Sequence, residues 1–308
     1  MKQIKRKIKT AITKPKTIGI KILNLISPIL SDRLYLRLLF PLRTGYKLNL
    51  NNPQTYNEKL QWLKLNYRND LYPIFVDKYE FKEYARKIIG DEYIIKTYGI
   101  WNSFDEIDFN KLPNQFVLKT THDQGGVVVC KNKSEFDIEK TRRKLNKHLQ
   151  RRNLYYLMRE WPYKYVKPRI IAEELLIEED EHGLKDYKFY CFHGEPKVSY
   201  ISYGRQGDKT YLDFYDLEFN KLDIRRPRFV QPKEVMQKPD NYDKMLSLAR
   251  KLAGNEPHVR IDFYNINGEI KLGEFTLFQG GGMMPFYPKK WDYILGEYIN
   301  LPDKKEMI

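Results

Sequence analysis

The sequence predicts an α+β fold whose strands are antiparallel. Up to about residue 90, apolar residues recur at helical spacing, whereas short apolar runs separated by turn residues begin at residue 93. The clearest strands are residues 259–264 and 269–276, which a short Asn- and Gly-containing segment joins. Strands this close in sequence pair as an antiparallel hairpin. The other elements are expected to support this hairpin.

Polar residues alternate with apolar ones along both strands of the predicted hairpin. In the first strand Arg260, Asp262 and Tyr264 therefore share one face, and in the second strand Glu274 and Thr276 share one face. If the two polar faces coincide, two carboxylates, a hydroxyl and a guanidinium form one patch. Such a patch suits a hard cation and phosphate oxygens.

Whether the polar faces coincide depends on the turn. A two-residue turn at 267–268 would send Asp262 and Glu274 to opposite faces. A three-residue loop at 266–268 would place Arg260 opposite Glu274, with Asp262 diagonal to it on the same face. We predict the three-residue loop.

The alternative interpretation is a half-exposed hairpin whose polar face meets water. Three consecutive glycines, Gly280, Gly281 and Gly282, follow the second strand. A solvated strand does not need this run, whereas glycines allow backbone to approach a ligand closely. The glycine run therefore favours a binding site.

Composition limits the classes of protein. The chain has 308 residues, with 31% charged and 42% hydrophobic residues, which is typical of a soluble globular protein of one or two domains. The formal net charge of +15 indicates an anionic partner such as a nucleotide, nucleic acid, acidic polysaccharide or lipid headgroups. Cys130 and Cys191 lack the spacing of a metal site, so we expect buried thiols in a reducing compartment.

Residues 1–31 are basic and contain no acidic residue before Asp32. The apolar run that follows the first lysines is interrupted by Lys21 and has no small-residue cleavage site, unlike a signal peptide. It is too short to span a bilayer. One interpretation is a basic amphipathic segment, within residues 1–30, that rests on an anionic inner membrane leaflet. The other is a solvated tail that leads into a core helix.

The next segments are predicted to be helical. Residues 32–40 form a short helix that ends at Pro41, and Thr55 with Glu58 forms the capping box of another helix. Residues 70–89 form a helical stretch broken near Pro73.

A polar loop lies between two predicted strands. Residues 93–95 form a first strand, and residues 116–119 pair with residues 127–130. The loop of residues 120–126 follows Lys119 and contains Gly125 and Gly126, so its backbone N–H groups offer a cradle for phosphates. Many hairpins end in Gly-Gly, so the loop by itself is a weak motif.

The remaining elements alternate between basic helix and strand. Residues 136–156 form a very basic helix, whose ordinary role is a solvated face. Residues 169–177 form a buried strand with acidic residues in its middle, and residues 186–192 return antiparallel. Residues 196–203 and 211–219 form further strands, and residues 240–252 form a helix.

Several segments together resemble the TupA-like ATP-grasp family, which is linked to teichuronopeptide and other surface-polymer synthesis. The resemblance runs from about residue 48 to residue 291 and depends on order and spacing. The segments that carry it are Asn52-Pro53-Gln54-Thr55-Tyr56-Asn57-Glu58-Lys59-Leu60-Gln61-Trp62, Val76-Asp77-Lys78-Tyr79, Phe116-Val117-Leu118-Lys119, Asp186-Tyr187-Lys188-Phe189, Val259-Arg260-Ile261-Asp262-Phe263-Tyr264 and Gly273-Glu274-Phe275-Thr276. It implies an ATP-grasp fold, in which two α+β subdomains hold a nucleotide between antiparallel sheets.

The resemblance also implies the domain limits and the cofactors. Residues 1–66 would be a basic tail and helical extension, residues 67–175 the N-terminal ATP-grasp subdomain with the phosphate loop, and residues 176–308 the C-terminal subdomain with the Mg-binding hairpin. ATP and Mg²⁺ are the implied cofactors.

Site residues follow from the resemblance, position by position. The implied cofactor-binding residues are Lys78, Lys119, Gly125, Gly126, Glu173, Glu174 and Leu176, and the implied metal ligands are Asp262, Glu274 and Thr276. The implied catalytic residues are Arg260, Lys119 and Lys188. A ribose contact from Glu178, Glu179 or Asp180 stays open, and Arg205 and Lys209 are candidates for holding an acidic acceptor.

The sequence departs from the ATP-grasp pattern at two places. Thr276 stands where these enzymes usually place a metal-binding asparagine, which puts a second metal in doubt. The proline common near the following glycine is displaced to Pro285.

The implied activity is ATP-dependent formation of an amide. A carboxylate would attack the terminal phosphate of ATP, and an amine would then attack the acyl phosphate. The acceptor would be an acidic sugar or polymer of the cell surface, and the expected location is the cytoplasm or the inner face of the membrane, with no specific nucleic acid partner. Two alternatives stay open: a glycosyltransferase or sugar kinase of capsule or exopolysaccharide synthesis, and a non-catalytic basic protein that binds polyanions.

Overall fold

The protein has an α+β fold with two separate antiparallel sheets. The structure is a computed structural model and describes residues 15–151, 153–178, 183–204, 209–227, 229–232 and 235–302. The four-stranded sheet has the order β1-β4-β2-β3, and the five-stranded sheet has the order β7-β6-β5-β8-β9. Their bounds are β1 Thr97–Trp101, β2 Phe116–Thr120, β3 Val127–Cys130, β4 Ile170–Glu173, β5 Asp186–Phe192, β6 Glu195–Tyr203, β7 Tyr211–Tyr215, β8 Val259–Ile266 and β9 Glu269–Thr276.

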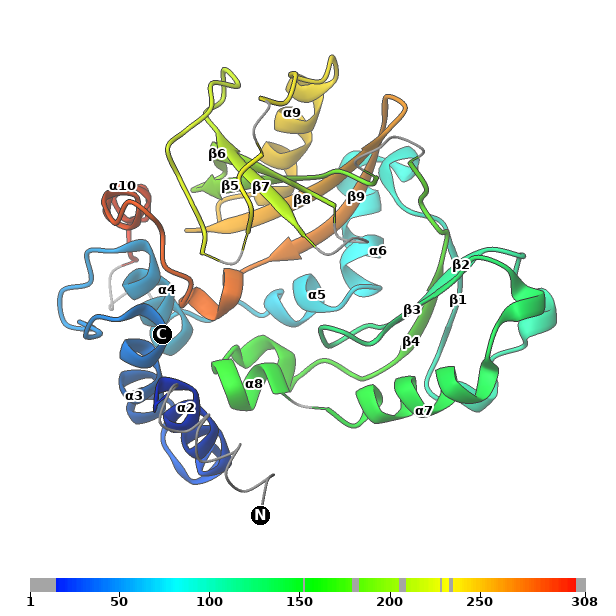
Figure 1. The fold of residues 1–308 in the computed structure, drawn as a ribbon, viewed down its shortest axis with the longest axis horizontal. Helices are drawn as coiled ribbons and strands as arrows, with labels where there is room; N and C mark the ends of the chain where they lie inside the picture. Colours follow the sequence, from blue (N-terminus) through cyan, green and yellow to red (C-terminus); the bar gives the residue numbers. More distant parts are fainter. Residues whose placement is uncertain are drawn as a thin grey trace.

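Helices surround the two sheets and connect them. Their bounds are α2 Pro15–Leu25, α3 Asp32–Thr44, α4 Tyr56–Asn66, α5 Tyr72–Val76, α6 Glu80–Ile89, α7 Ile138–Leu149, α8 Asn153–Met158, α9 Tyr242–Ala253 and α10 Lys290–Glu297. Figure 1 shows the sheets in separate lobes, with α5 and α6 between them and with α2 and α3 at one end of the molecule. None of these helices is long and apolar enough to cross a membrane within the described ranges.

Each lobe has its own hydrophobic core. The larger core surrounds the five-stranded sheet, whose strand β5 is buried along its whole length, and it includes residues of α4, α5, α6 and α9. The smaller core lies between the four-stranded sheet and α7 and contains Phe116, Leu145 and Ile170. A third cluster joins α2 to α3 and includes Met283. Because each sheet buries its own apolar face, the lobes are distinct packing units.

Several predicted helix ends are confirmed, and one is wrong. Thr55 Oγ1 accepts a hydrogen bond from Glu58 N at 3.2 Å, and Glu58 Oε2 accepts one from Thr55 N at 3.1 Å, which is the predicted capping box. Helix α3 does not stop before Pro41 but continues to Thr44 and ends at Gly45, whose φ is 87°. Proline removes only one helical hydrogen bond, and the carbonyl that loses its partner belongs to the exposed Arg37.

The stretch of residues 70–89 consists of two helices, and its break is not where we predicted it. Pro73 lies inside the first turn of α5, where proline is tolerated. The chain breaks at Asp77, whose Oδ1 accepts hydrogen bonds from Tyr79 N at 2.8 Å and Glu80 N at 3.1 Å. These bonds satisfy N–H groups at the start of α6.

Two predicted strand assignments are wrong because the strands pair elsewhere. Residues 91–93 form a short 3₁₀ helix (η2, Asp91–Tyr93), and the strand begins only at Thr97. Strand β5 does not return along β4; β4 pairs with β1 and β2, whereas β5 pairs with β6 and β8. The chain therefore passes from one sheet to the other between the end of β4 and the start of β5.

Helix α4 docks on the five-stranded sheet through a buried histidine. His258 Nδ1 lies 3.0 Å from the carbonyl oxygen of Cys191, to which it donates, so its Nε2 accepts from Tyr56 Oη at 2.8 Å. The ring is 2% exposed. Burial lowers the pKa of His258 from 6.5 to about 3.

This neutral histidine makes stability depend on pH. The unfolded chain takes up a proton on His258 below about pH 6.5, whereas the folded protein does not until about pH 3. The stabilisation is therefore fully present above about pH 6.5 and is lost as the pH falls toward 3. We expect wild-type protein to lose a few kcal/mol more than His258→Gln across this interval, since each pKa unit is worth about 1.4 kcal/mol. Urea unfolding midpoints of both proteins, measured across this pH range, check the prediction; parallel pH profiles would contradict it.

Candidate active site

The hairpin of β8 and β9 has a different turn from the one we predicted. Ile266 pairs with Glu269, so the turn consists of two residues, Asn267 and Gly268. Their φ values are 50° and 87°. Asn-Gly is a favoured sequence for this turn because both central positions need positive φ. The predicted three-residue loop is therefore wrong.

A β-bulge nevertheless brings the two carboxylates to the same face. The pairing shifts between Phe263 and Asp262, so that Phe263 lies opposite Leu272 but Asp262 lies opposite Glu274. Gly273 is the extra residue of the bulge. A Cβ atom at Gly273 would lie 3.2 Å from the carbonyl oxygen of Asp262, so glycine permits this close approach.

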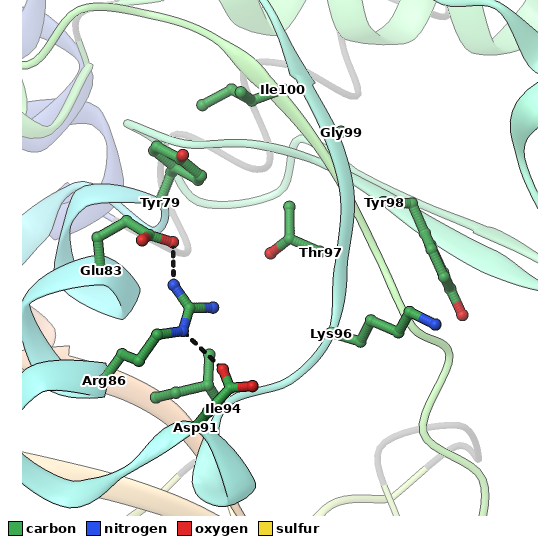
Figure 2. A pocket seen from close by; sticks show the side chains of 10 residues that line it. All are labelled: Tyr79, Glu83, Arg86, Asp91, Ile94, Lys96, Thr97, Tyr98, Gly99 and Ile100. Atoms are coloured by element: carbon green, nitrogen blue, oxygen red, sulfur yellow. Dashed lines mark hydrogen bonds and ion pairs between the residues drawn. The ribbon is translucent and has the colours of Figure 1, made fainter.

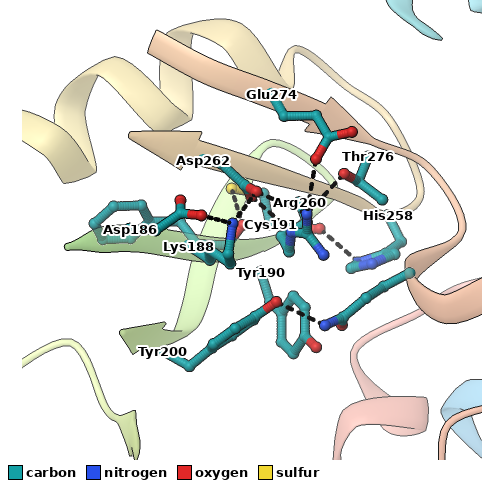
Figure 3. A network of polar contacts seen from close by, with 12 residues as sticks. Asp186, Lys188, Tyr190, Cys191, Tyr200, His258, Arg260, Asp262, Glu274 and Thr276 are labelled. Carbon is teal, nitrogen blue, oxygen red and sulfur yellow. Dashed lines mark hydrogen bonds and ion pairs between the residues drawn. The ribbon is translucent and has the colours of Figure 1, made fainter. Parts of the chain in front are cut away.

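Arg260 and Asp262 form a buried bidentate ion pair at the centre of this face (Figure 3). Nε of Arg260 donates to Oδ1 of Asp262 at 2.6 Å, and Nη2 donates to Oδ2 at 2.7 Å. Lys188 lies directly opposite Asp262 on β5; its Nζ contacts the same Oδ2 and lies 2.6 Å from Oδ2 of Asp186. The carboxylate of Asp262 thus contacts two cations, Arg260 from its own strand and Lys188 from the neighbouring strand.

These contacts set the charges of the cluster. Burial disfavours the charged form of Asp262, but the Arg260 and Lys188 cations outweigh it, so the pKa of Asp262 lies below its usual value. Burial likewise opposes the charge on Arg260, but the Asp262 carboxylate outweighs it and raises the pKa of Arg260. Asp262 and Arg260 therefore stay ionised at neutral pH.

Glu274 and Thr276 extend the cluster toward the surface. Nη2 of Arg260 donates to Thr276 Oγ1 at 2.9 Å and lies 3.4 Å from Glu274 Oε2. The side chain of Glu274 is 44% exposed, whereas that of Asp262 is 2% exposed. Glu274 is therefore the more accessible of the two carboxylates.

Lys78 lies against the loop of residues 120–126. Its Nζ donates to the carbonyl oxygens of Thr120 at 3.1 Å and Asp123 at 2.6 Å. Helix α7 supports the same loop, because Asp123 Oδ2 lies 2.5 Å from Nδ1 of His148. A Cβ atom at Gly126 would lie 2.0 Å from Thr120 Oγ1, so the loop requires glycine there; Gly125 has a φ of 93°.

Lys119 and Glu173 form an ion pair within the four-stranded sheet. Nζ of Lys119 lies 2.5 Å from Oε2 of Glu173, and Nζ of Lys82 on α6 contacts Oε1 of the same carboxylate. Although burial opposes its charge, these two lysines lower the pKa of Glu173 to about 2. We did not predict Lys82; the only signal was its position one helical turn after Lys78.

Charges of the two lobes act on one another. Burial lowers the pKa of Lys78, and the largest opposing effect is the attraction of Glu274, ahead of Asp123. Lys119 and Glu173 act on the same ammonium group. The hairpin carboxylate from the five-stranded sheet and the lysines beside the four-stranded sheet therefore lie within electrostatic reach of each other.

The remaining predicted residues lie after β4, before β7 or outside the described residues. Glu174 is exposed and donates its N–H to the carbonyl oxygen of Lys96 at 2.9 Å, and Leu176 is partly buried in the segment that crosses between sheets. Lys209 is exposed just before β7. Arg205, Glu179 and Asp180 lie outside the described residues.

A second polar group, which we did not predict, includes Tyr190 and Tyr200, which lie below the ion pair in Figure 3. Gln279 Nε2 donates to Tyr200 Oη at 2.7 Å, and Nη2 of Arg226 donates to Tyr190 Oη at 3.1 Å. The guanidinium of Arg226 also stacks on Phe286, with its central carbon 3.7 Å from the ring centre. These residues alternate with apolar ones or lie in irregular segments, so no sequence pattern distinguished them from ordinary packing.

The glycine run contacts helix α4. Gly280, Gly281 and Gly282 all have positive φ, between 57° and 66°, so the segment Gln279–Gly282 (η7) is a turn that is not regularly helical. Gln61 Nε2 donates to the carbonyl oxygen of Gly282 at 2.6 Å, and Lys64 Nζ donates to that of Gly281 at 2.6 Å. A Cβ atom at Gly282 would lie 2.5 Å from Gln61 Nε2. The run therefore approaches helix α4 closely, whereas we predicted a close approach to a ligand.

Lys64, which contacts this run, and Glu160 are both buried and interact electrostatically. Burial raises the pKa of Glu160 to about 7 and lowers that of Lys64 to about 8, although each group attracts the other. Glu274 raises the pKa of Glu160 further. The pair therefore lies within electrostatic reach of the hairpin, and nothing in the sequence around Glu160 indicated it.

A pocket of about 530 Å³ lies between α6 and β1 (Figure 2). Its lining includes Arg86, which contacts Glu83 and lies 2.6 Å from Asp91 Oδ1. The lining contains none of the residues that we predicted for the site. We therefore place the candidate site at the hairpin and not at this pocket.

Solved structures with similar folds include several ligases. The D-alanine–D-alanine ligase of Helicobacter pylori is 19% identical with a TM-score of 0.43, over 80% of this chain and 69% of that chain. The L-amino acid ligase of Bacillus licheniformis is 14% identical with a TM-score of 0.43, over 73% and 49%. The D-alanine–D-alanine ligase of Bacillus anthracis complexed with ATP is 13% identical with a TM-score of 0.41; the match covers 72% of this chain but only 61% of that enzyme.

The sequence itself identifies the family. No curated protein matches the chain at a significant level. The model of the TupA-like ATPgrasp family, however, matches residues 58–300, from the first turn of α4 to beyond α10. This match spans most of the chain and includes both sheets, as the resemblance of the sequence motifs implied. The chain therefore belongs to the TupA-like ATP-grasp family.

Proposed function

We propose that the protein is an ATP- and Mg²⁺-dependent carboxylate–amine ligase that forms an amide through an acyl phosphate. Family membership supports this proposal, and so does the chemistry of the hairpin residues. The observation that carries it is the pairing of Asp262 with Glu274 beside Arg260, within electrostatic reach of Lys78. Two acids and several fixed cations are what Mg²⁺ and a triphosphate require.

The residues present fit a magnesium ion. Asp262 and Glu274 supply hard carboxylate oxygens on adjacent strands, which are preferred ligands of Mg²⁺. Within the described ranges no group of three or more His, Cys, Asp and Glu residues could hold a metal alone. Two carboxylates suit a metal that phosphate oxygens share. Bound Mg²⁺ would neutralise phosphate charge. The Thr276 hydroxyl already accepts a hydrogen bond from Arg260, so it is engaged where a ligand of a second metal would be needed, and this supports one metal rather than two.

The phosphates of ATP would meet the lysines and the loop. Lys78 and Lys119 would exchange contacts with protein oxygens for contacts with phosphate, which are charge-assisted hydrogen bonds. Backbone N–H groups at Gly125 and Gly126 would complete the cradle. The segment that includes Glu174 and Leu176 would lie beside the adenine.

Arg260 and Lys188 would act on the transferred phosphoryl group. Both are held by Asp262, so their positions are set before the substrate binds. Preorganised cations stabilise charge that develops in a transition state better than mobile ones. No side-chain nucleophile is required, because a substrate carboxylate attacks phosphorus and a substrate amine attacks the resulting acyl group.

The substrates that fit best are an acidic sugar or polymer of the cell surface and an amine. The surplus of positive charge supports an acidic acceptor, and Arg205 and Lys209 are candidates to hold it. The reaction consumes ATP, so we place it on the cytoplasmic side of the membrane.

The reaction type can be tested by its products. The full chain is incubated with Mg²⁺, ATP and pairs of uronic acids and amino acids, with hydroxylamine added in parallel. A ligase should release phosphate only when a carboxylate and an acceptor amine are both present, and hydroxylamine should yield a hydroxamate. Transfer of labelled phosphate to a hydroxyl group would show a sugar kinase instead, and polyanion binding without ATP turnover would show a non-catalytic protein.

Glu274 provides the clean test of the metal site. We expect Glu274→Gln to lower Mg²⁺-dependent ATP turnover by roughly a hundredfold or more, the scale on which preorganised electrostatic groups contribute. The control is Glu269→Gln on the same strand, whose side chain is 75% exposed. Asp262→Asn should also abolish turnover, but it removes the carboxylate charge that contacts both Arg260 and Lys188 and should reduce stability too. Full turnover by Glu274→Gln would exclude this metal site.

Lys78 provides a test of nucleotide binding. Charge-assisted hydrogen bonds contribute about 1.5–3 kcal/mol, so Lys78→Met should weaken binding of ATP with Mg²⁺ by roughly ten- to a hundredfold. The matched control is Lys140→Met, which changes an exposed lysine on α7. Calorimetric titration of both variants gives the dissociation constants, and circular dichroism shows that each is folded. Equal affinities would mean that Lys78 serves only to hold the loop.

A further inference from the structure

The N-terminal helices expose a group of large apolar side chains. We define the N-terminal apolar patch as residues of α2, of the short 3₁₀ helix η1 (Ser27–Ile29) and of α3 whose side chains face outward. Its members and their exposed fractions are Ile22 57%, Leu25 81%, Ile26 39%, Ile29 83%, Leu34 46% and Leu38 44%. Leu25 and Ile29 have the largest exposed fractions among the exposed large hydrophobic residues of the described chain. Exposed apolar side chains that gather on neighbouring helices favour an interaction site.

The exposure follows from how the two helices pack. Leu23 on α2 and Leu36, Leu39 and Phe40 on α3 are buried in the cluster that joins the helices. Their burial fixes the rotation of each helix, so the opposite sides face outward. Ile22 and Leu25 share a helix face, as do Leu34 and Leu38, because they are three or four residues apart. The outward position of the patch is therefore a property of the packed fold.

The patch lies in the most basic part of the chain. Residues 1–45 contain eleven Lys and Arg residues and one acidic residue, and this excess of ten accounts for two thirds of the formal net charge of +15. Lys21 lies on the helix face of Ile22 and Leu25, and Arg33 and Arg37 flank Leu34 and Leu38. The single acid, Asp32, is itself engaged by Nε of Arg159 at 3.1 Å. Helices α2 and α3 thus expose both apolar and cationic side chains.

We propose that the N-terminal apolar patch docks on an anionic lipid bilayer. A soluble polyanion would use the cations but would leave Leu25 and Ile29 in water. A second copy of the chain would cover the apolar side chains but would bring two strongly cationic surfaces together. An anionic membrane surface satisfies both features, because its headgroups attract Lys and Arg while its acyl boundary accepts apolar side chains. This inference does not depend on the ligase activity.

The experiment is co-sedimentation of the full chain with phospholipid vesicles. One set contains roughly one third phosphatidylglycerol in phosphatidylcholine, and the other contains phosphatidylcholine alone. We expect the wild-type chain to bind the anionic vesicles at least about tenfold more strongly than the neutral ones, and to be released by high salt. Equal binding to both sets, or no binding to either, would overturn the proposal.

Variants separate the patch from charge alone. Leu25→Ser with Ile29→Ser should lower partitioning into anionic vesicles at least about tenfold, because each side chain loses its apolar contact with lipid. The control is Val235→Ser with Ile138→Ser, which removes exposed apolar side chains elsewhere and should leave binding unchanged. Thermal unfolding should be alike for both double variants, since all four side chains face solvent. Unchanged binding by Leu25→Ser/Ile29→Ser would show that charge alone attracts the chain. If the wild-type chain is a dimer without lipid in ultracentrifugation and the double variant is a monomer, the patch is a self-association surface instead. Either result overturns the proposal.

Discussion

The ion pair between Arg260 and Asp262 is the contact on which the candidate site depends. Both side chains are almost fully buried, and a buried charge is tolerated only when it is paired and hydrogen-bonded. The pair lies on β8, while Lys188 reaches it from β5 and Thr276 from β9. Three strands must therefore pair in one register for these charges to be compensated. The same constraint places the half-exposed Glu274 beside the buried cluster, where a carboxylate can meet a ligand.

Helix α4 connects this cluster to the N-terminal helices. Gln61 and Lys64 hold the carbonyl oxygens of the glycine run, and Met283, which follows the run directly, belongs to the core between α2 and α3. The core between α2 and α3 thus contacts the segment that follows strand β9 of the candidate site. An N-terminal extension that appeared separate from the ATP-grasp sheets is in this way part of the support of the site.

Local signals in the sequence predicted local structure well. The capping box of Thr55 and Glu58, the pairing of residues 116–119 with 127–130, and the helix at 240–252 are all confirmed, because each depends on residues close in the chain. The errors arose where a distant partner decides the outcome. The strand that we predicted at 93–95 is instead β1, which starts at Thr97, where β4 is available to pair. Residues 136–156 do not form one helix but contain two, α7 and α8. The turn at Asn267 and Gly268 has the two residues that its sequence favours. With that turn alone, Asp262 and Glu274 would lie on opposite faces, so we predicted a longer loop. The bulge at Gly273 is what brings both carboxylates to the same face.

By itself the sequence determined the family, the α+β class, and the chemical types of the residues on the hairpin, because alternation along a strand and the order of short motifs are written in the chain. The tertiary structure alone decided which charges meet. It paired Lys82 and Lys119 with Glu173, and it brought Lys64 and Glu160, and likewise Glu274 and Lys78, within electrostatic reach of each other. These partners are far apart in sequence or lie in different lobes, and no periodic pattern specifies them. Their pairing follows from how two sheets and helix α4 bury their apolar faces, which fixes the positions of polar groups that would otherwise have many possible partners.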